Sequence, residues 1–226
     1  MNYIVFYNTL VGIAAGVGLI GVAKLFNKLY KKEDVAADGW ALLFAPAGII
    51  LTVLGLAITI TWPYRVPGTF DANILFGEPA IAFGLLLLTA SFYLWHERAG
   101  LDIAKVWRVL KPVSIYVFGL GLVMGACAIS WLRFKLGAAP PTEPISGYFS
   151  GHPLFEASFL FVLYGFVALG ALLFPLLPGG KRPKVAKFVY WLWLIAGIVF
   201  LLFSALNYYT HIGLLQNGTM HTNYRW

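Results

Sequence analysis

Four ionisable side chains lie close to the ends of long apolar segments, and together they could bind a metal ion: Glu78, His152, Glu156 and His211. His152 and Glu156 are four residues apart across a helix start, so they share one helix face. Imidazole and carboxylate groups are ligands for zinc, iron and copper. A haem would need one or two histidines facing an apolar slot, so His152 and His211 are also candidate cofactor ligands.

A second interpretation of these residues needs no cofactor. A carboxylate near a helix N-terminus is stabilised by the helix dipole, and polar side chains at a membrane interface cap helices and bind loops. The sequence has no H-E-x-x-H, no paired cysteine ligands, no phosphate-binding glycine loop and no G-x-S-x-G. It therefore leaves open whether the protein is an enzyme and whether a haem or a transition metal binds.

The composition predicts that these residues are positioned by membrane helices. Hydrophobic residues make up 60% of the 226 residues and charged residues 11%, whereas a soluble domain carries about 25% charged residues. A helix needs about 20 apolar residues to cross the hydrocarbon layer. We predict an all-α bundle in the lipid bilayer, formed by residues 1–226 as one transmembrane domain with six helices: 3–26, 40–62, 78–95, 113–132, 153–177 and 188–210.

The basic residues predict how the chain is oriented in the membrane. Twelve of the 16 Lys and Arg residues follow the first, third and fifth helices: Lys24, Lys28, Lys31, Lys32, Arg98, Lys105, Arg108, Lys111, Lys181, Arg182, Lys184 and Lys187. The positive-inside rule places these loops in the cytoplasm. The protein is then a multi-pass protein of the cell membrane with both termini extracytoplasmic, and its net charge of +7 needs no nucleic-acid partner.

The predicted outer side contains Arg65 and three further basic residues, and it also contains a possible glycosylation sequon. Asn217–Gly218–Thr219 follows the sixth predicted helix and matches the N-x-[ST] acceptor pattern. The outer loops are rich in proline, and we expect them to form a lid over the site: Pro63, Pro67, Pro140, Pro141 and Pro144. Under that lid, the third, fifth and sixth helices would have to be neighbours.

Two parts of the sequence resemble each other and suggest a duplicated pair of helices. The second loop closes with Gly77–Glu78–Pro79, and the fourth closes with Gly151–His152–Pro153. Proline is favoured at the first position of a helix, so we expect Glu78 and His152 at equivalent helix starts. Parallel repeats would place the two residues at the same membrane depth; a chance resemblance would not.

One short segment is expected to lie outside the six spans. Residues 101–110 combine Asp102, Lys105 and Arg108 with apolar residues before Pro112. This mixture predicts a short amphipathic stretch along the cytoplasmic interface.

Short motifs in the second loop carry a resemblance to a known family. Trp62–Pro63, the loop as far as Asn73, and Gly77–Glu78–Pro79 resemble a family of small prokaryotic multi-pass membrane proteins defined only as a domain of unknown function. The resemblance covers most of the chain. It implies a membrane fold and no mechanism.

Three functions remain open from the sequence. The first is an accessory or cofactor-bearing subunit of a larger membrane redox or respiratory complex, with other membrane subunits as partners. The second is a membrane metalloenzyme using the outward-facing His and Glu residues. The third is a small-solute channel or carrier, although no span contains a ladder of buried charged residues, which many ion-coupled carriers have.

Overall fold

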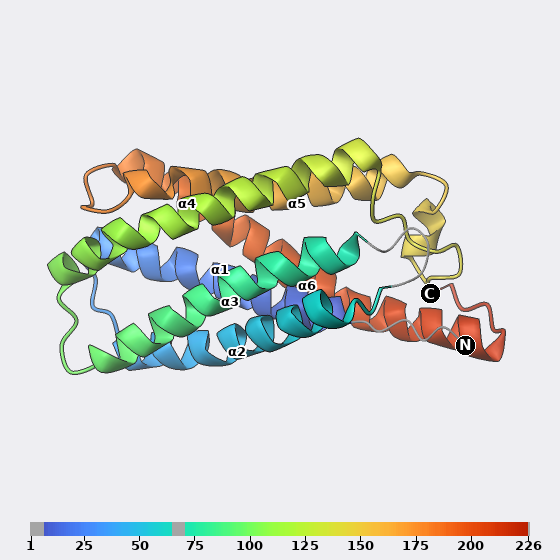
Figure 1. The fold of residues 1–226 in the computed structure, drawn as a ribbon, viewed down its shortest axis with the longest axis horizontal. Coiled ribbons are helices and arrows are strands. Elements are labelled where there is room, and N and C mark those ends of the chain that lie inside the picture. The colour runs from blue at the N-terminus through green and yellow to red at the C-terminus, as the bar shows by residue number, and fades with distance from the viewer. Residues whose placement is uncertain (1–6, 65–70, 226) are drawn as a thin grey trace.

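The computed structural model describes residues 7–64 and 71–225, and in these ranges the chain forms six long helices and no strand (Figure 1). The six are α1 (Tyr7–Lys31), α2 (Ala37–Thr61), α3 (Ala72–His96), α4 (Ile103–Phe134), α5 (Pro153–Leu173) and α6 (Pro183–Met220). Two short 3₁₀ helices, η1 (Ser146–Phe149) and η2 (Phe174–Leu176), precede and follow α5. All six long helices are long and apolar enough to cross a membrane, which confirms the predicted all-α bundle of six transmembrane helices.

The helices pack as three antiparallel pairs. The hairpins α2–α3 and α4–α5 are two of them, and the third joins α1 to α6, which are the first and last helices of the chain. The start of α1 and the end of α6 lie at the same end of the bundle (Figure 1). We call this the terminal end, and it also holds the α4–α5 loop. The α1–α2, α3–α4 and α5–α6 loops lie at the opposite end, which we call the basic end.

Glycines allow the paired helices to approach closely. A Cβ atom on Gly84 of α3 would lie 2.9 Å from the carbonyl oxygen of Gly48 on α2. A Cβ atom on Gly16 of α1 would lie 2.7 Å from the carbonyl oxygen of Gly197 on α6. Close backbone approach at small residues is a common way for membrane helices to associate. Here it joins α2 to α3, which are adjacent in sequence, and α1 to α6, which are distant in sequence.

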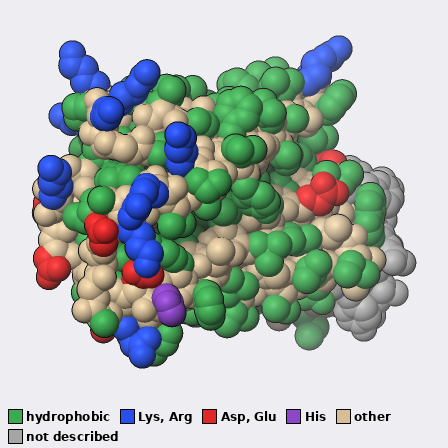
Figure 2. Space-filling view, turned by 60° about the vertical axis from the view of Figure 1, so that its left-hand side comes forward, with side chains coloured by type: hydrophobic (Ala, Val, Ile, Leu, Met, Phe, Trp, Pro, Cys, Tyr) green, Lys and Arg blue, Asp and Glu red, His purple; other side chains and the backbone are tan. Residues whose placement is uncertain are grey.

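The flanks of the bundle are covered by large apolar side chains. Phe92 of α3 and Ile115 of α4 are each 77% exposed, and apolar side chains spread over the face seen in Figure 2. Soluble monomers rarely expose contiguous apolar surface on this scale. The flanks therefore face lipid, and the protein is a multi-pass membrane protein.

The basic end gathers most of the Lys and Arg side chains of the face shown in Figure 2. Some of them are paired with acids of the same end. Lys105 Nζ lies 2.6 Å from Glu97 Oε1, and Lys28 Nζ lies 3.8 Å from Glu33 Oε2. Most of the basic residues thus sit together at one end, as the charge pattern predicts, and their cytoplasmic location stays a prediction.

The third helix begins earlier than predicted. It starts at Ala72, so Pro79 lies inside the helix and Glu78 lies in its second turn, whereas His152 is the N-cap residue of α5. The expectation of equivalent helix starts at Glu78 and His152 is wrong, because α3 tolerates both Pro79 and Asn73, the one polar side chain between Ala72 and Glu78. Asn73 shows why: its side chain binds both the N–H and the carbonyl of Tyr64.

Two other helices are longer than predicted. Helix α4 runs through Pro112 without a break, so residues 101–110 do not form a separate amphipathic stretch. Helix α6 continues to Met220, so His211 lies inside the helix and not after it. At about 1.5 Å per residue, the 38 residues of α6 exceed the roughly 30 Å hydrocarbon layer, and its end projects beyond it. Residues 3–6 of the first predicted span, Arg65 and Pro67 lie outside the described residues.

Candidate functional site

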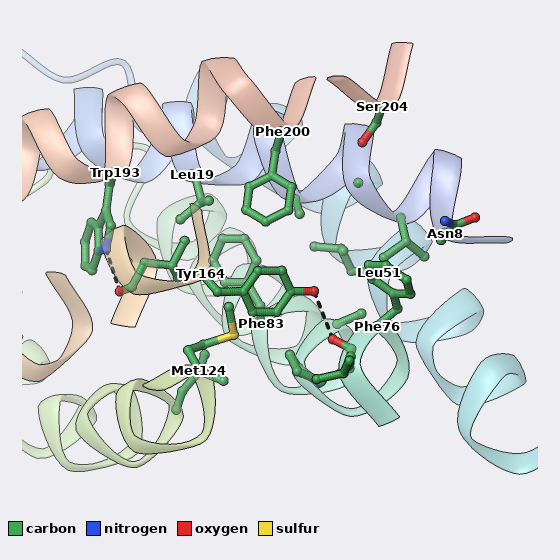
Figure 3. A pocket seen from close by; sticks show the side chains of 18 of the residues that line it. Asn8, Leu19, Leu51, Phe76, Phe83, Met124, Tyr164, Trp193, Phe200 and Ser204 are labelled. Carbon is green, nitrogen blue, oxygen red and sulfur yellow. Dashed lines mark hydrogen bonds between the residues drawn. The ribbon is translucent and has the colours of Figure 1, made fainter. Parts of the chain in front are cut away.

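A cavity of about 1030 Å³ occupies the interior of the bundle. Its walls are mostly aliphatic and aromatic side chains from α1, α3, α4, α5 and α6, and Figure 3 shows Phe83, Met124 and Phe200 among them. The volume is at the upper end of the range for small-molecule sites, which is roughly 300–1,000 Å³. The cavity is therefore large enough for a sizeable apolar molecule.

Tyr164 of α5 is one of the residues that line this cavity (Figure 3). Its hydroxyl donates to the carbonyl oxygen of Leu75 on α3 over 3.0 Å. Proline has no N–H, so Pro79 cannot donate to this carbonyl four residues earlier as an ordinary helical residue would. Tyr164 thus satisfies a carbonyl that the Pro79 of α3 leaves free, and it joins α5 to α3 across the cavity.

The polar lining of the cavity is concentrated at the terminal end. The acids and the histidine that line it all lie there: Asp71, Glu143, Glu156 and His211. Asn8 at the start of α1, and Ser204 and Asn207 late in α6, line the same end. Farther in, the lining is apolar apart from a few hydroxyl and indole groups. The cavity is therefore amphiphilic, with an apolar body and one polar end.

Glu143 and His211 face each other at this polar end. Glu143 Oε1 lies 3.8 Å from Nε2 of His211, and Nδ1 of His211 lies 2.9 Å from the hydroxyl oxygen of Thr9 on α1. Glu143 is 6% exposed and Thr9 is 2% exposed. Three segments that are distant in sequence therefore form one buried row of a hydroxyl, an imidazole and a carboxyl group.

The environment of Glu143 favours its neutral form. Burial raises the pKa of its carboxyl above the usual value, and the side chains of Thr210 and Ser146 oppose this shift. A second carboxyl group, that of Glu156, lines the same cavity, and its Oε2 accepts a hydrogen bond from the Ala139 N–H over 2.7 Å. The site can therefore both donate and accept hydrogen bonds.

A polar cap closes the site at the terminal end. It consists of the loop 135–152 and the tail 221–225, which are tied together by Asn217 near the end of α6. The Asn217 amide nitrogen donates to the carbonyls of Thr142 and Tyr224 over 2.7 and 2.8 Å. Its oxygen accepts from the N–H of Tyr224 and the hydroxyl of Thr222. Because Asn217 is 5% exposed and lies within α6, it is not the open surface loop that glycosylation needs.

The cap contains a strained turn next to Glu143. Ile145 has φ 63° and ψ −68°, and the Ser146 N–H donates to the carbonyl of Pro144 over 2.7 Å. These values describe a γ-turn with positive φ, which is rare and strained and especially unfavourable for a β-branched residue. The bond from the Ile145 N–H to the Arg225 carbonyl, 3.1 Å long, holds the turn against the tail.

The expected proline lid is found in part. Pro144 is fully buried in the cap, Pro140 lines the cavity, and the carbonyl of Pro141 accepts from the Arg225 guanidinium over 2.7 Å. Pro67 lies outside the described residues. The cap is thus built from the α4–α5 loop and the tail. The part played by the tail was not predicted from the sequence.

The structure brings together only part of the predicted metal site. Glu156 and His211 line the polar end of the cavity, whereas Glu78 and His152 are exposed and do not line it. Within the described residues, no three His, Cys, Asp or Glu side chains are grouped so that they could hold a metal ion. The His and Glu residues that converge are thus arranged as a hydrogen-bonding site.

Sequence reasoning missed two residues of this site. Glu143 stands between prolines in the fourth loop, and a lone acid in a Pro-rich loop was a signal that could have found it. Thr9 gives no such signal, because a threonine in the first turns of an apolar helix is common. Its role follows only from the packing of α1 against α6.

Comparison with known proteins identifies a family and no activity. No curated protein matches the chain, and no solved structure matches it either. The family model described as "Protein of unknown function (DUF981)" matches residues 1–213, which include the first five long helices and α6 as far as Gly213. This match agrees with the resemblance carried by the second loop, and the chain belongs to the DUF981 family.

Proposed function

We propose that the protein binds a lipid-soluble molecule with a long apolar part and one polar group, and that it does so as a cofactor-bearing subunit of a membrane redox complex. A quinone is the molecule of this kind that membrane redox complexes use. The observation that carries the proposal is the lining of the central cavity, which is apolar along its length and polar at one end.

Residues of α3 and α4 that both line the cavity and are exposed on the flank of the bundle support entry of such a molecule from the bilayer. Leu85 and Thr89 of α3 and Tyr116 of α4 line the cavity and are also exposed on the flank of the bundle. The Tyr116 hydroxyl donates to the Ala82 carbonyl over 3.2 Å and so bridges α3 and α4. A lipid-soluble molecule could reach the cavity between these helices without passing through water.

The other two functions have less support. A metalloenzyme would need converging ligands, and Glu78 and His152 are exposed away from the cavity. A small-solute channel or carrier would need polar groups along its path to replace the hydration shell of the solute. The middle of the cavity instead offers side chains such as Leu19, Phe83 and Met124.

The lipids that copurify with the protein test whether a lipid-soluble molecule binds in the cavity. The protein is purified in mild detergent, and the lipids that copurify are quantified by mass spectrometry, isoprenoid quinones included. Leu120→Trp fills the cavity from α4, and Leu122→Trp is its matched control, because Leu122 is 56% exposed and does not line the cavity. We expect a bound apolar molecule that is lost in Leu120→Trp and retained in Leu122→Trp.

The redox role has a separate readout. Proteins that copurify with the chain should include one that carries haem, flavin or an iron–sulfur cluster, which an absorption spectrum of the assembly detects. Equal lipid content in the two tryptophan variants would contradict the binding site. A bound lipid without any redox partner would leave a lipid-binding protein and remove the redox complex from the proposal.

A further inference from the structure

The charges around the cavity restrict the chemistry of the molecule it holds. In the described part of the chain, no Lys or Arg side chain lines the cavity, whereas Asp71, Glu143 and Glu156 do. A phosphate head group would bring its negative charge next to these carboxyl groups with no cation to pair it. An unpaired charge in a buried site is costly, so phosphate-headed lipids do not fit.

A neutral oxygen-bearing group fits the same residues. A protonated carboxyl group donates one hydrogen bond, and an ionised one only accepts. A neutral imidazole has one donor and one acceptor nitrogen, and the Thr9 hydroxyl at 2.9 Å from Nδ1 of His211 orients the ring. Nε2 of His211 and the carboxyl of Glu143, which are 3.8 Å apart, both belong to residues that line the cavity, where they can hydrogen-bond to such a group.

We propose that Glu143 and His211 bind a neutral carbonyl or hydroxyl head group of the lipid-soluble molecule, and that Thr9 acts as the positioning residue for the imidazole. This assignment rests on the function proposed above. It narrows the ligand from any apolar molecule to one with a ring ketone or a hydroxyl at its polar end, which describes a quinone and its hydroquinone.

The proton on Glu143 determines which of the two forms binds better. A protonated Glu143 donates to a carbonyl oxygen, and an ionised Glu143 accepts from a hydroxyl group. Burial raises the pKa of Glu143, so the donating form persists to higher pH than it would in water. The groups that face this carboxyl are His211 and Thr210 of α6, Ser146 of the cap and the more distant Glu156 of α5.

Three probes with one common tail separate the head groups: a decyl benzoquinone, its hydroquinone kept without oxygen, and decyl phosphate. Binding to the purified full-length protein is measured by thermal shift between acidic and neutral pH. We expect the first two probes to stabilise the protein and decyl phosphate to stabilise it far less. Quinone binding should weaken as the pH rises and Glu143 ionises, while hydroquinone binding should not.

Variants assign this behaviour to particular residues. Glu143→Gln should remove the pH dependence of quinone binding, because the amide donates at every pH. Glu78→Gln is the matched control and should bind as the unmodified protein does, since Glu78 is exposed and away from the cavity. Thr9→Val should weaken quinone binding roughly three- to tenfold, which corresponds to one lost hydrogen bond, and Thr9→Ser should restore it.

The outcomes distinguish this assignment from the proposed function. The head-group assignment is wrong if decyl phosphate binds as tightly as the quinone, or if Glu143→Gln keeps the pH dependence of the unmodified protein. Neither result contradicts the proposed lipid-binding function. If none of the three probes binds, both the head-group assignment and the lipid-binding function are contradicted. Thermal unfolding of each variant without probe shows that it is folded, and a folded Glu143→Gln variant is expected because its amide resembles the neutral carboxyl group.

Discussion

Tyr164 and Pro79 are coupled at the scale of single residues. Pro79 leaves the Leu75 carbonyl without its helical donor, and the Tyr164 hydroxyl, on a side chain 3% exposed, supplies another. Neighbouring helices often satisfy backbone groups that proline frees in membrane helices. The pair therefore shows how a residue unfavourable to α3 alone becomes compatible with the bundle.

Tyr164→Phe should lower the free energy of unfolding by about 1–3 kcal/mol, because it leaves the Leu75 carbonyl buried and unpaired. Pro79→Ala restores a backbone donor to that carbonyl. In the Pro79→Ala background, Tyr164→Phe should therefore cost much less. A double-mutant cycle in detergent measures the difference, and an equal cost in both backgrounds would show that the two residues are not coupled.

Glu143 makes the stability of the protein depend on pH. Burial raises its pKa in the folded state above the ordinary value of 4.5, so folding favours the protonated form. Its contribution to stability is therefore full below about pH 4.5 and is lost as the pH rises through the folded pKa. Melting temperatures of unmodified protein and Glu143→Gln should converge at low pH, and the variant should be the more stable one at neutral pH. The opposite ordering would mean that Glu143 is held ionised.

His152 provides a contrast to His211. The side chain of His152 caps no backbone group at the start of α5 and is exposed, while His211 lies against Glu143 and Thr9. The sequence assigned the two histidines the same candidate role. The two histidines differ only in their surroundings: the side chain of His152 is exposed, and that of His211 lines the cavity.

At the scale of elements, α2 and α3 are held together by close backbone contact. A Cβ atom on Gly84 would lie 2.7 Å from the Thr52 nitrogen and 2.9 Å from the Gly48 carbonyl oxygen. Gly84→Ala should therefore force the helices apart and cost about 1–3 kcal/mol. Gly119→Ala in α4 is the control, because a Cβ there meets nothing within 4 Å; it should be neutral or stabilise by about 0.5–1 kcal/mol. Thermal unfolding of the two variants in detergent provides the measurement.

The cap is held by one residue of α6. Asn217→Ala removes two donated and two accepted hydrogen bonds between α6, the α4–α5 loop and the tail. Backbone amides of residues 139–149 should then exchange hydrogen roughly tenfold faster or more, because they open locally. Asn223→Ala is the matched control in the exposed part of the tail. Unchanged exchange in Asn217→Ala would show that the loop is held without the tail.

At the scale of the whole molecule, the orientation in the membrane can be tested directly. Thr142→Cys places a thiol in the exposed part of the terminal cap, and Lys181→Cys places one in the loop of the basic end. The natural Cys127 is buried. A membrane-impermeant thiol reagent should label Thr142→Cys in intact cells and leave Lys181→Cys unlabelled. The reverse pattern would place the polar end of the cavity in the cytoplasm.

The sequence by itself determined the class of the molecule. Hydropathy is a property of contiguous residues, so six apolar runs predict six helices whatever their packing. The clustering of basic residues at one end follows equally from their positions between those runs. Helix ends were less well determined: α3 starts at Ala72 and α6 ends at Met220, because polar residues inside these helices find partners that local composition does not reveal.

Only the tertiary structure decided the site. Thr9 and His211 are 202 positions apart, and they meet because Gly16 and Gly197 let α1 and α6 approach closely. Glu143 joins them because the α4–α5 loop folds over the end of α6. Of the four residues grouped from the sequence, Glu156 and His211 line the cavity and Glu78 and His152 do not, because the grouping rested on membrane depth and on the four-residue spacing of His152 and Glu156. Depth can be read from the position of a residue in a span, whereas the direction of its side chain depends on which helices pack against it.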